Sequence, residues 1–197
     1  MTALPKLPEP PGWMSTSEFL VWDAPDGLAW QLVDGVPQAM APASRTHGAI
    51  QSELARLLSN HLAERGSPCS VVVTPGVVPR VNAERNVRIP DLAVTCSPYE
   101  AEEAVLADPV LLIEILSPSN HAETWINVWS YTTIPSVQEI LVVRATSVGA
   151  ELLRRNPDAT WPDRPLPVED GERLTLDSVG FSVPVADLYR TTRLARR

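Results

Sequence analysis

One carboxylate lies inside a continuous apolar run. Residues 111–116 read Leu-Leu-Ile-Glu-Ile-Leu, so Glu114 is the only polar side chain in the run. A run of this length is typical of a strand that is buried on both faces. An ionised glutamate there destabilises the fold unless its charge is compensated. Glu114 is therefore protonated, paired through space with a cationic group, or a ligand of a bound cation.

A second isolated acid, Asp91, lies in the strand-like segment 87–94. Side chains alternate between the two faces of a strand, so Asp91 shares a face with Ala93, and Glu114 shares a face with Leu112. If these faces coincide, the two carboxylates converge. Carboxylates on neighbouring strands form a site for a hard divalent metal ion.

Pro90, directly before Asp91, removes a backbone donor from this strand. Such a proline favours a strand edge or a bulge, where side chains are often redirected toward a site. The alternative is that Asp91 is an exposed acid at a strand end and Glu114 is a core acid paired with an arginine.

Length and composition indicate one soluble globular domain. The chain has 197 residues, 44% of them hydrophobic and 20% charged, which is enough to build a sizeable core. Residues 1–12 include four prolines and are expected to form an extended arm before a domain at 13–197. We find neither a transmembrane run nor a signal peptide, and therefore expect a cytoplasmic protein with no membrane partner. The two cysteines, Cys69 and Cys96, are expected to be buried small side chains and not a disulfide.

The net charge of −8 argues against a nucleic-acid binder that depends on overall positive charge. A bound metal and a local cluster of Arg80, Arg85 and Arg88 could still make one cleft positive. The alternative is that these arginines are ordinary solvated loop residues.

Local patterns predict the order of helices and strands. A capping box at Ser15 and Glu18 opens a short helix, and Asp34-Gly35 is typical of a hairpin turn. The remaining segments follow from apolar periodicity. They are strands 28–33 and 36–40, a long helix 46–64, strands 71–78, 87–95 and 110–116, a helix 122–132, strands 139–145 and 151–155, a loop 156–170, and a strand pair with a helical turn over 173–189. The predicted class is a mixed sheet with flanking helices.

Several ordered motifs resemble the Uma-type family of restriction endonucleases, within the PD-(D/E)xK superfamily of nucleases. They are Leu-Val-Asp-Gly at 32–35, His47 at the start of the long helix, Arg-Ile-Pro-Asp at 88–91, Glu-Ile-Leu-Ser-Pro-Ser at 114–119, Tyr131, and Pro-Val-Ala-Asp-Leu-Tyr at 184–189. The resemblance implies a restriction-endonuclease-like sheet core and a DNA endonuclease that depends on Mg2+ or Mn2+. It further implies that Asp91 and Glu114, with the carbonyl of Ile115, bind the metal.

Two positions depart from the family pattern. Gln31 stands where the family usually has glutamate, and Asn127 stands where its catalytic lysine is expected on the helix. The only lysine of the chain is Lys6, in the proline-rich arm. Loss of the lysine removes a group that would stabilise charge on the phosphate, so activity is expected to be weakened or lost. The alternative function is a non-catalytic DNA-binding or assembly module with the nuclease fold.

His47 and Arg88 are candidate phosphate contacts, since the resemblance places His47 at a helix N-terminus near the metal site. The alternative for His47 is a residue of the cap region that packs on the sheet. His61 is expected in the core and His121 in a solvated loop. Trp125 and Trp129, one helical turn apart, are expected to pack in the core or in a homodimer interface, which is favoured over base stacking. A homodimer would give a nuclease two sites for two DNA strands.

Overall fold

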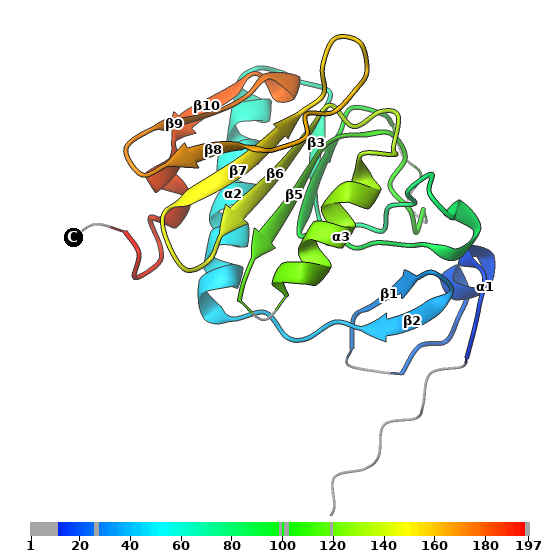
Figure 1. The fold of residues 1–197 in the computed structure, drawn as a ribbon. Coiled ribbons are helices and arrows are strands. Elements are labelled where there is room, and N and C mark those ends of the chain that lie inside the picture. The colour runs from blue at the N-terminus through cyan, green and yellow to red at the C-terminus, as the bar shows by residue number, and fades with distance from the viewer. Residues whose placement is uncertain (1–11, 26–27, 99, 101–102, 119, 196–197) are drawn as a thin grey trace, which may run out of the picture.

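A six-stranded mixed sheet forms the centre of the molecule (Figure 1). The computed structural model describes residues 12–25, 28–98, 100, 103–118 and 120–195, so nearly all of the predicted arm lies outside the described residues. The strands are neighbours in chain order: β3 (Ser70–Val73), β4 (Leu92–Thr95), β5 (Pro109–Leu116), β6 (Glu139–Arg144), β7 (Gly149–Arg154) and β8 (Leu166–Glu169). Only β5 and β6 run parallel, because α3 (His121–Tyr131) returns the chain between them.

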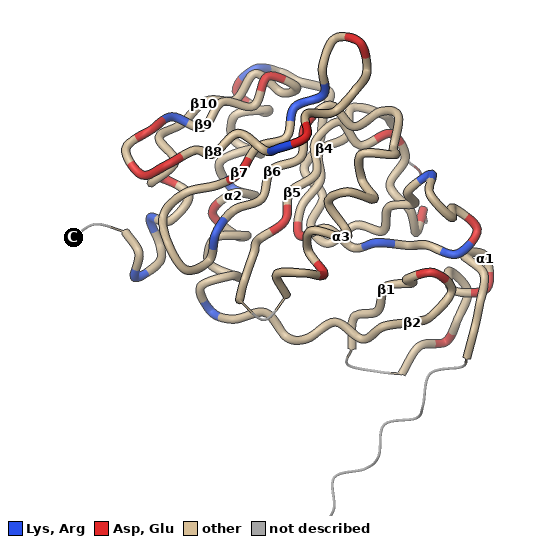
Figure 2. Tube along the Cα trace, in the orientation of Figure 1, with Lys and Arg blue, Asp and Glu red and all other residues tan. Residues whose placement is uncertain are grey.

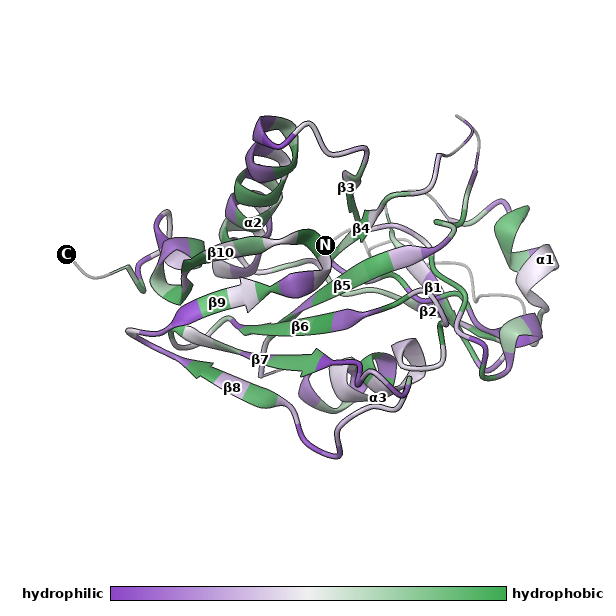
Figure 3. Cartoon of the chain, turned by 90° about the horizontal axis from the view of Figure 1, so that it is seen from above, coloured by the Kyte–Doolittle hydropathy of each residue, from purple (hydrophilic) through white to green (hydrophobic). Residues whose placement is uncertain are grey.

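Two helices cover opposite faces of this sheet. Seen from above, α2 (Arg45–Glu64) lies on one side and α3 on the other (Figure 3). Leu54 and Leu58 of α2 pack with Ile113, whereas Val128 and Tyr131 of α3 belong to a separate apolar cluster. Consecutive residues of β5 therefore alternate between the two helices, as the period of a strand requires.

Smaller elements extend the domain at its two ends. α1 (Thr16–Leu20) begins with the predicted capping box, and Ser15 and Glu18 bond reciprocally. The hairpin of β1 (Trp30–Val33) and β2 (Val36–Ala39) turns at Asp34 and Gly35, whose φ values are 48° and 87°. A second hairpin, β9 (Arg173–Leu176) and β10 (Phe181–Pro184), precedes the 3-10 helix η3 (Val185–Tyr189).

The predicted class, a single α/β domain with a mixed sheet flanked by helices, is confirmed. Two of its predicted strands are shorter than expected, because β3 ends at Val73 and β4 begins only after Pro90. The predicted loop at 156–170 contains the edge strand β8, which pairs with β7. Pro167 is compatible with this edge position, where one side of the strand has no partner.

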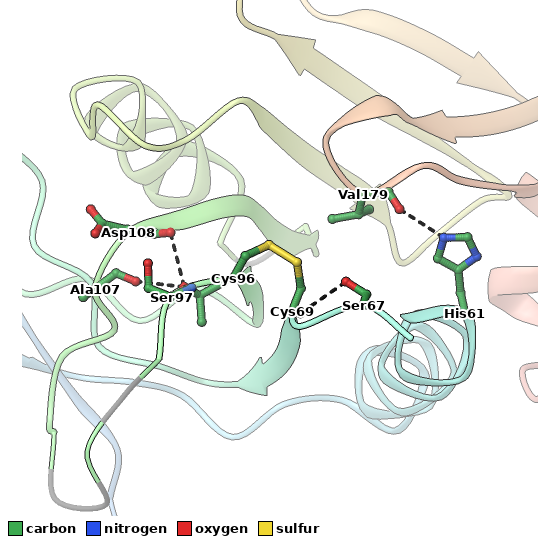
Figure 4. The surroundings of a disulfide bond; sticks show 9 residues. His61, Ser67, Cys69, Cys96, Ser97, Ala107, Asp108 and Val179 are labelled. Atoms are coloured by element: carbon green, nitrogen blue, oxygen red, sulfur yellow. Dashed lines mark hydrogen bonds between the residues drawn. A yellow bond between two sulfur atoms is a disulfide. The ribbon is translucent and has the colours of Figure 1, made fainter. Parts of the chain in front are cut away.

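The cysteine prediction was wrong, because Cys69 and Cys96 form a disulfide (Figure 4). The register of β3 and β4 pairs Ser70 with Thr95, so the next residues outward face each other across the two strands. Cys96 is exposed and Cys69 is half-buried. The pairing depends on strand register, which the spacing of two cysteines does not reveal.

Charged residues of both signs are spread along the trace (Figure 2). Within the described part of the chain, no helix is long and apolar enough to span a membrane.

Candidate metal centre and active site

Asp91 lies at the start of β4 and is held on three sides. Its Oδ1 is 2.7 Å from Nε2 of His47, and its Oδ2 accepts a 2.7 Å hydrogen bond from the backbone N–H of Ile115. The Gln51 amide donates to the Asp91 carbonyl oxygen at 2.9 Å. His47 and Gln51 are one turn apart on α2, so the beginning of this helix orients the acid.

Glu114 is buried in the middle of β5, with 6% of its surface exposed. The hydroxyl of Tyr131 donates a 2.7 Å hydrogen bond to its Oε1. Burial raises the pKa of Glu114 well above its ordinary value, and the charge of Asp91 raises it further. Hydrogen bonds from Tyr131 and Asn127 act in the opposite direction on this pKa, but they are the smaller effects.

No ion pair to Glu114 is formed by the residues that the structure describes. This finding removes the alternative in which an arginine neutralises Glu114. Protonation and cation binding remain as the two ways to compensate the charge.

Asp91 and Glu114 lie where strand alternation placed them. Ala93 and Leu112, two residues from each acid, belong to the same apolar cluster beside α3. The register pairs Leu92 with Ile113, so Asp91 lies opposite Glu114 across the two strands. The structure therefore brings the two acids together, with Asp91 directly before β4 and Glu114 opposite it on β5.

The carbonyl of Ile115 is available beside these acids. Leu92 pairs with Ile113, so the residue opposite Ile115 on the continuation of β4 is Pro90. Proline has no N–H and cannot bond this carbonyl. Pro90 thus gives the Ile115 carbonyl no hydrogen bond from the segment before β4.

These oxygens suit a hydrated Mg2+ or Mn2+ ion. No group of three or more His, Cys, Asp or Glu side chains that could hold a metal occurs in the described ranges. Mg2+ is usually held by one or two carboxylates and keeps several water ligands, so it needs no closed cage of protein side chains. Two carboxylates and one carbonyl fit that preference. They do not fit a structural zinc site, which needs four protein ligands.

Both departures from the family pattern lie on the same side of the sheet as Glu114. Gln31 is 2% exposed, and its Nε2 donates a 2.6 Å hydrogen bond to Oε1 of Glu123. Its Oε1 is buried without a partner. Glu123, Asn127 and Tyr131 follow one another at single-turn spacing along α3, so one helix face presents all three.

Arg88 reaches the same helix face. It is 3% exposed, and its guanidinium donates to Oδ1 of Asn127 at 3.1 Å. The predicted cluster with Arg80 and Arg85 is not formed, because both of those residues are exposed and Arg85 lies over the ring of Trp13. Arg80 and Arg85 are therefore the solvated arginines of the alternative interpretation. Arg88 is not, because it is buried.

Comparison with known proteins identifies the family. The sequence model described as "Uma2: Putative restriction endonuclease" matches residues 16–186. The chain belongs to the Uma2 family. The uncharacterized protein slr1290 of Synechocystis sp. (strain ATCC 27184 / PCC 6803 / Kazusa) is 32% identical over 179 residues, which cover 90% of this chain and 92% of that protein. The family predicted from the motifs is thereby confirmed.

A solved structure shares the Uma2 fold of this chain. It is a crystal structure described as a putative nuclease belonging to DUF820 from Anabaena variabilis ATCC 29413, with a TM-score of 0.72 and 17% sequence identity. The match covers 89% of this chain and 97% of the other. At this identity the likeness shows a common fold.

The remaining histidines and aromatic residues divide between core and surface. His61 bonds the carbonyl of Val179 at 3.0 Å and packs edge-on against Phe181, so it is structural in this Uma2 protein. His121 is exposed, as predicted, but it begins α3 instead of lying in a loop. Sequence reasoning did not name Gln51 as a site residue. Its position four residues after His47, on the same helix face, was the available signal.

Proposed function

We propose that this Uma2 protein is a Mg2+-dependent endonuclease that hydrolyses phosphodiester bonds of DNA. The observation that carries the proposal is Glu114, a buried acid beside Asp91 with no ion-pair partner among the described residues. Such a pair is unfavourable without a cation.

Asp91, Glu114 and the Ile115 carbonyl would hold the Mg2+ or Mn2+ ion. When bound, the ion would lower the pKa of a water molecule and neutralise charge on the phosphate. His47 keeps Asp91 in one orientation through Oδ1, and the Ile115 N–H does so through Oδ2. Tyr131 holds Glu114 in the same way. These contacts limit the reorganisation that catalysis would otherwise require.

Gln31 and Asn127 take the positions of a family glutamate and the family lysine. A neutral amide at each position interacts more weakly with the metal and the phosphate than the charged group it replaces. The expected activity is therefore low. His47 and Arg88 are the proposed phosphate contacts. We expect Mn2+ to support more activity than Mg2+, because Mg2+ demands a stricter coordination geometry.

A homodimer is the proposed assembly. Ile126 and Trp129 on α3 are 59% and 42% exposed, and Trp125 lies beside Trp129 with ring centroids 6.5 Å apart. A second copy covering this apolar face would bring two sites to one DNA duplex.

The second candidate is a non-catalytic DNA-binding or assembly module. It is favoured by Asn127 in place of lysine and by the net charge of −8. A module of this kind would keep the fold, and the two acids would bind metal without cutting DNA.

Two measurements separate these functions. Calorimetric titration should detect Mg2+ or Mn2+ binding to the wild type, with loss of binding in Asp91→Asn and Glu114→Gln. Plasmid nicking should then require the metal and both acids. Metal binding without nicking, at excess DNA, would favour the non-catalytic module, and no metal binding at all would contradict both the site and the enzyme.

A further inference from the structure

Arg88 is a buried cation whose side chain is largely unpaired. Its backbone is fixed by reciprocal hydrogen bonds with Val77, at 2.9 and 2.8 Å, and the residue is 3% exposed. In the part of the chain that the structure describes, its guanidinium makes one side-chain hydrogen bond, to Asn127, and its Nε has no hydrogen-bond partner. Within the described residues no carboxylate lies within ion-pair distance of it.

Other arginines of the molecule are better satisfied. Arg154 pairs with buried Glu139 at 2.7 Å. Arg155 donates to three backbone carbonyls, those of Thr132, Ile134 and Pro135. Burial without such partners lowers the pKa of Arg88, although an arginine side chain remains charged in proteins. The charges of Asp34 and Glu123 favour the charged guanidinium from beyond ion-pair distance, and an anion in direct contact would offset more of the cost of its burial.

Asn127 connects Arg88 to the metal-binding acid. Its Oδ1 accepts from Arg88, and it lies one helical turn before Tyr131, whose hydroxyl donates to Oε1 of Glu114. The position that carries the family lysine therefore holds an amide that orients a guanidinium from another segment of the chain. The positive charge is present in the site, but it comes from the segment before β4 instead of from α3.

We propose that Arg88 replaces the missing lysine as the group that binds the non-bridging oxygens of the attacked phosphate, with Asn127 as its positioning residue. The inference rests on the proposed nuclease function. In the reaction a water molecule gives up one proton to solvent and its oxygen forms a new bond to phosphorus, the bond to one ester oxygen breaks, and the leaving oxygen takes a proton from solvent. Arg88 transfers no proton; its planar fork stabilises the negative charge that develops on the phosphate.

The test compares Arg88→Met, Arg88→Lys and the double variant Arg88→Met with Asn127→Lys. Metal-dependent plasmid nicking should fall roughly a hundredfold in Arg88→Met, the usual effect of losing one electrostatic donor. Arg88→Lys should keep part of the activity. The double variant should regain most of the activity, because the lysine at position 127 supplies a positive charge from α3. Arg164→Met, an exposed loop arginine away from the site, is the matched control and should cut like the wild type.

Thermal melting of the metal-free proteins is the second readout. Arg88→Met should melt no lower than the wild type, because it removes an unpaired buried charge, whereas loss of a purely structural arginine would lower the melting temperature. If Arg88→Met does melt lower, recovery of nicking in the double variant still supports the inference, and failure of that recovery overturns it. If Arg88→Met nicks DNA as fast as the wild type, the inference is overturned and the proposed nuclease function stands. Absence of nicking in the wild type, with metal bound, removes the nuclease function and the inference together.

Discussion

At the scale of single residues, the charge of Glu114 dominates the candidate site. Its carboxyl is buried beside Asp91, and its hydrogen bond from Tyr131 offsets only part of the cost. Removal of a buried, uncompensated charge usually stabilises a protein, whereas removal of one partner from a satisfied ion pair destabilises it. The response of stability to substitution therefore distinguishes a binding residue from a structural one.

Glu114→Gln should stabilise the metal-free protein, and the gain should grow with pH. The folded pKa of Glu114 lies above its ordinary value of 4.5, so the folded state binds more protons than the unfolded state between these two pKa values. Wild-type stability therefore falls as pH rises through this window, and the glutamine variant lacks that loss. We expect a difference of about 1–3 kcal/mol above the window, or roughly 2–10 °C in melting temperature.

Thermal melts of both proteins between acid and alkaline pH would measure this effect. Adding Mg2+ should raise the melting temperature of the wild type but not that of the variant. A glutamine variant that is much less stable than the wild type at every pH would mean that Glu114 is a structural acid.

At the scale of elements, the site is assembled where β4, β5, α2 and α3 meet. The start of α2 supplies His47 and Gln51, and one face of α3 supplies Asn127 and Tyr131. The disulfide lies at the other end of β4, after Thr95, whereas Asp91 precedes the strand. A change at the disulfide should therefore affect stability more than metal binding.

Reduction of the disulfide should lower the free energy of unfolding. The bond closes a loop with a sequence separation of 27 residues. In the chain-entropy model, a loop of this size contributes about 3–4 kcal/mol by restricting the unfolded state. Denaturant unfolding of oxidised protein with and without dithiothreitol measures the difference. The Cys69→Ser, Cys96→Ser double variant should not respond to dithiothreitol, and Mg2+ affinity should be the same in all forms.

At the scale of the whole molecule, the net charge is −8, and the Lys and Arg positions are spread along the trace among acidic ones (Figure 2). Binding should then depend on the divalent metal and on few phosphate contacts, and its salt dependence should be shallow. Assembly into a dimer adds contacts by joining two sites, which makes the oligomeric state important for function.

Light scattering should give a particle of twice 21.5 kDa for the wild type. Trp129→Glu should shift the mass to that of a monomer, because it puts a charge into the apolar face of α3. Leu166→Glu, which changes an exposed apolar residue on β8, is the control and should leave the mass unchanged. A monomeric wild type at micromolar concentration would contradict the proposed homodimer.

Local signals in the sequence determined much of this protein. The capping box at Ser15, the Asp34-Gly35 turn and the apolar period of α2 depend on residues close together in the chain, so they could be recognised without coordinates. Strand alternation also brought Asp91 and Glu114 to one face, because the period of a strand holds wherever the strand lies.

Tertiary structure decided what depends on register and on contacts distant in sequence. The edge strand β8 forms because its backbone pairs with β7. The disulfide forms because the register of β3 and β4 places Cys69 opposite Cys96. Arg88 looked like one of three loop arginines, yet the chain buries it against Asn127, 39 residues away. No local pattern encodes such a contact, since it is the packing of α3 on the sheet that decides which side chains meet.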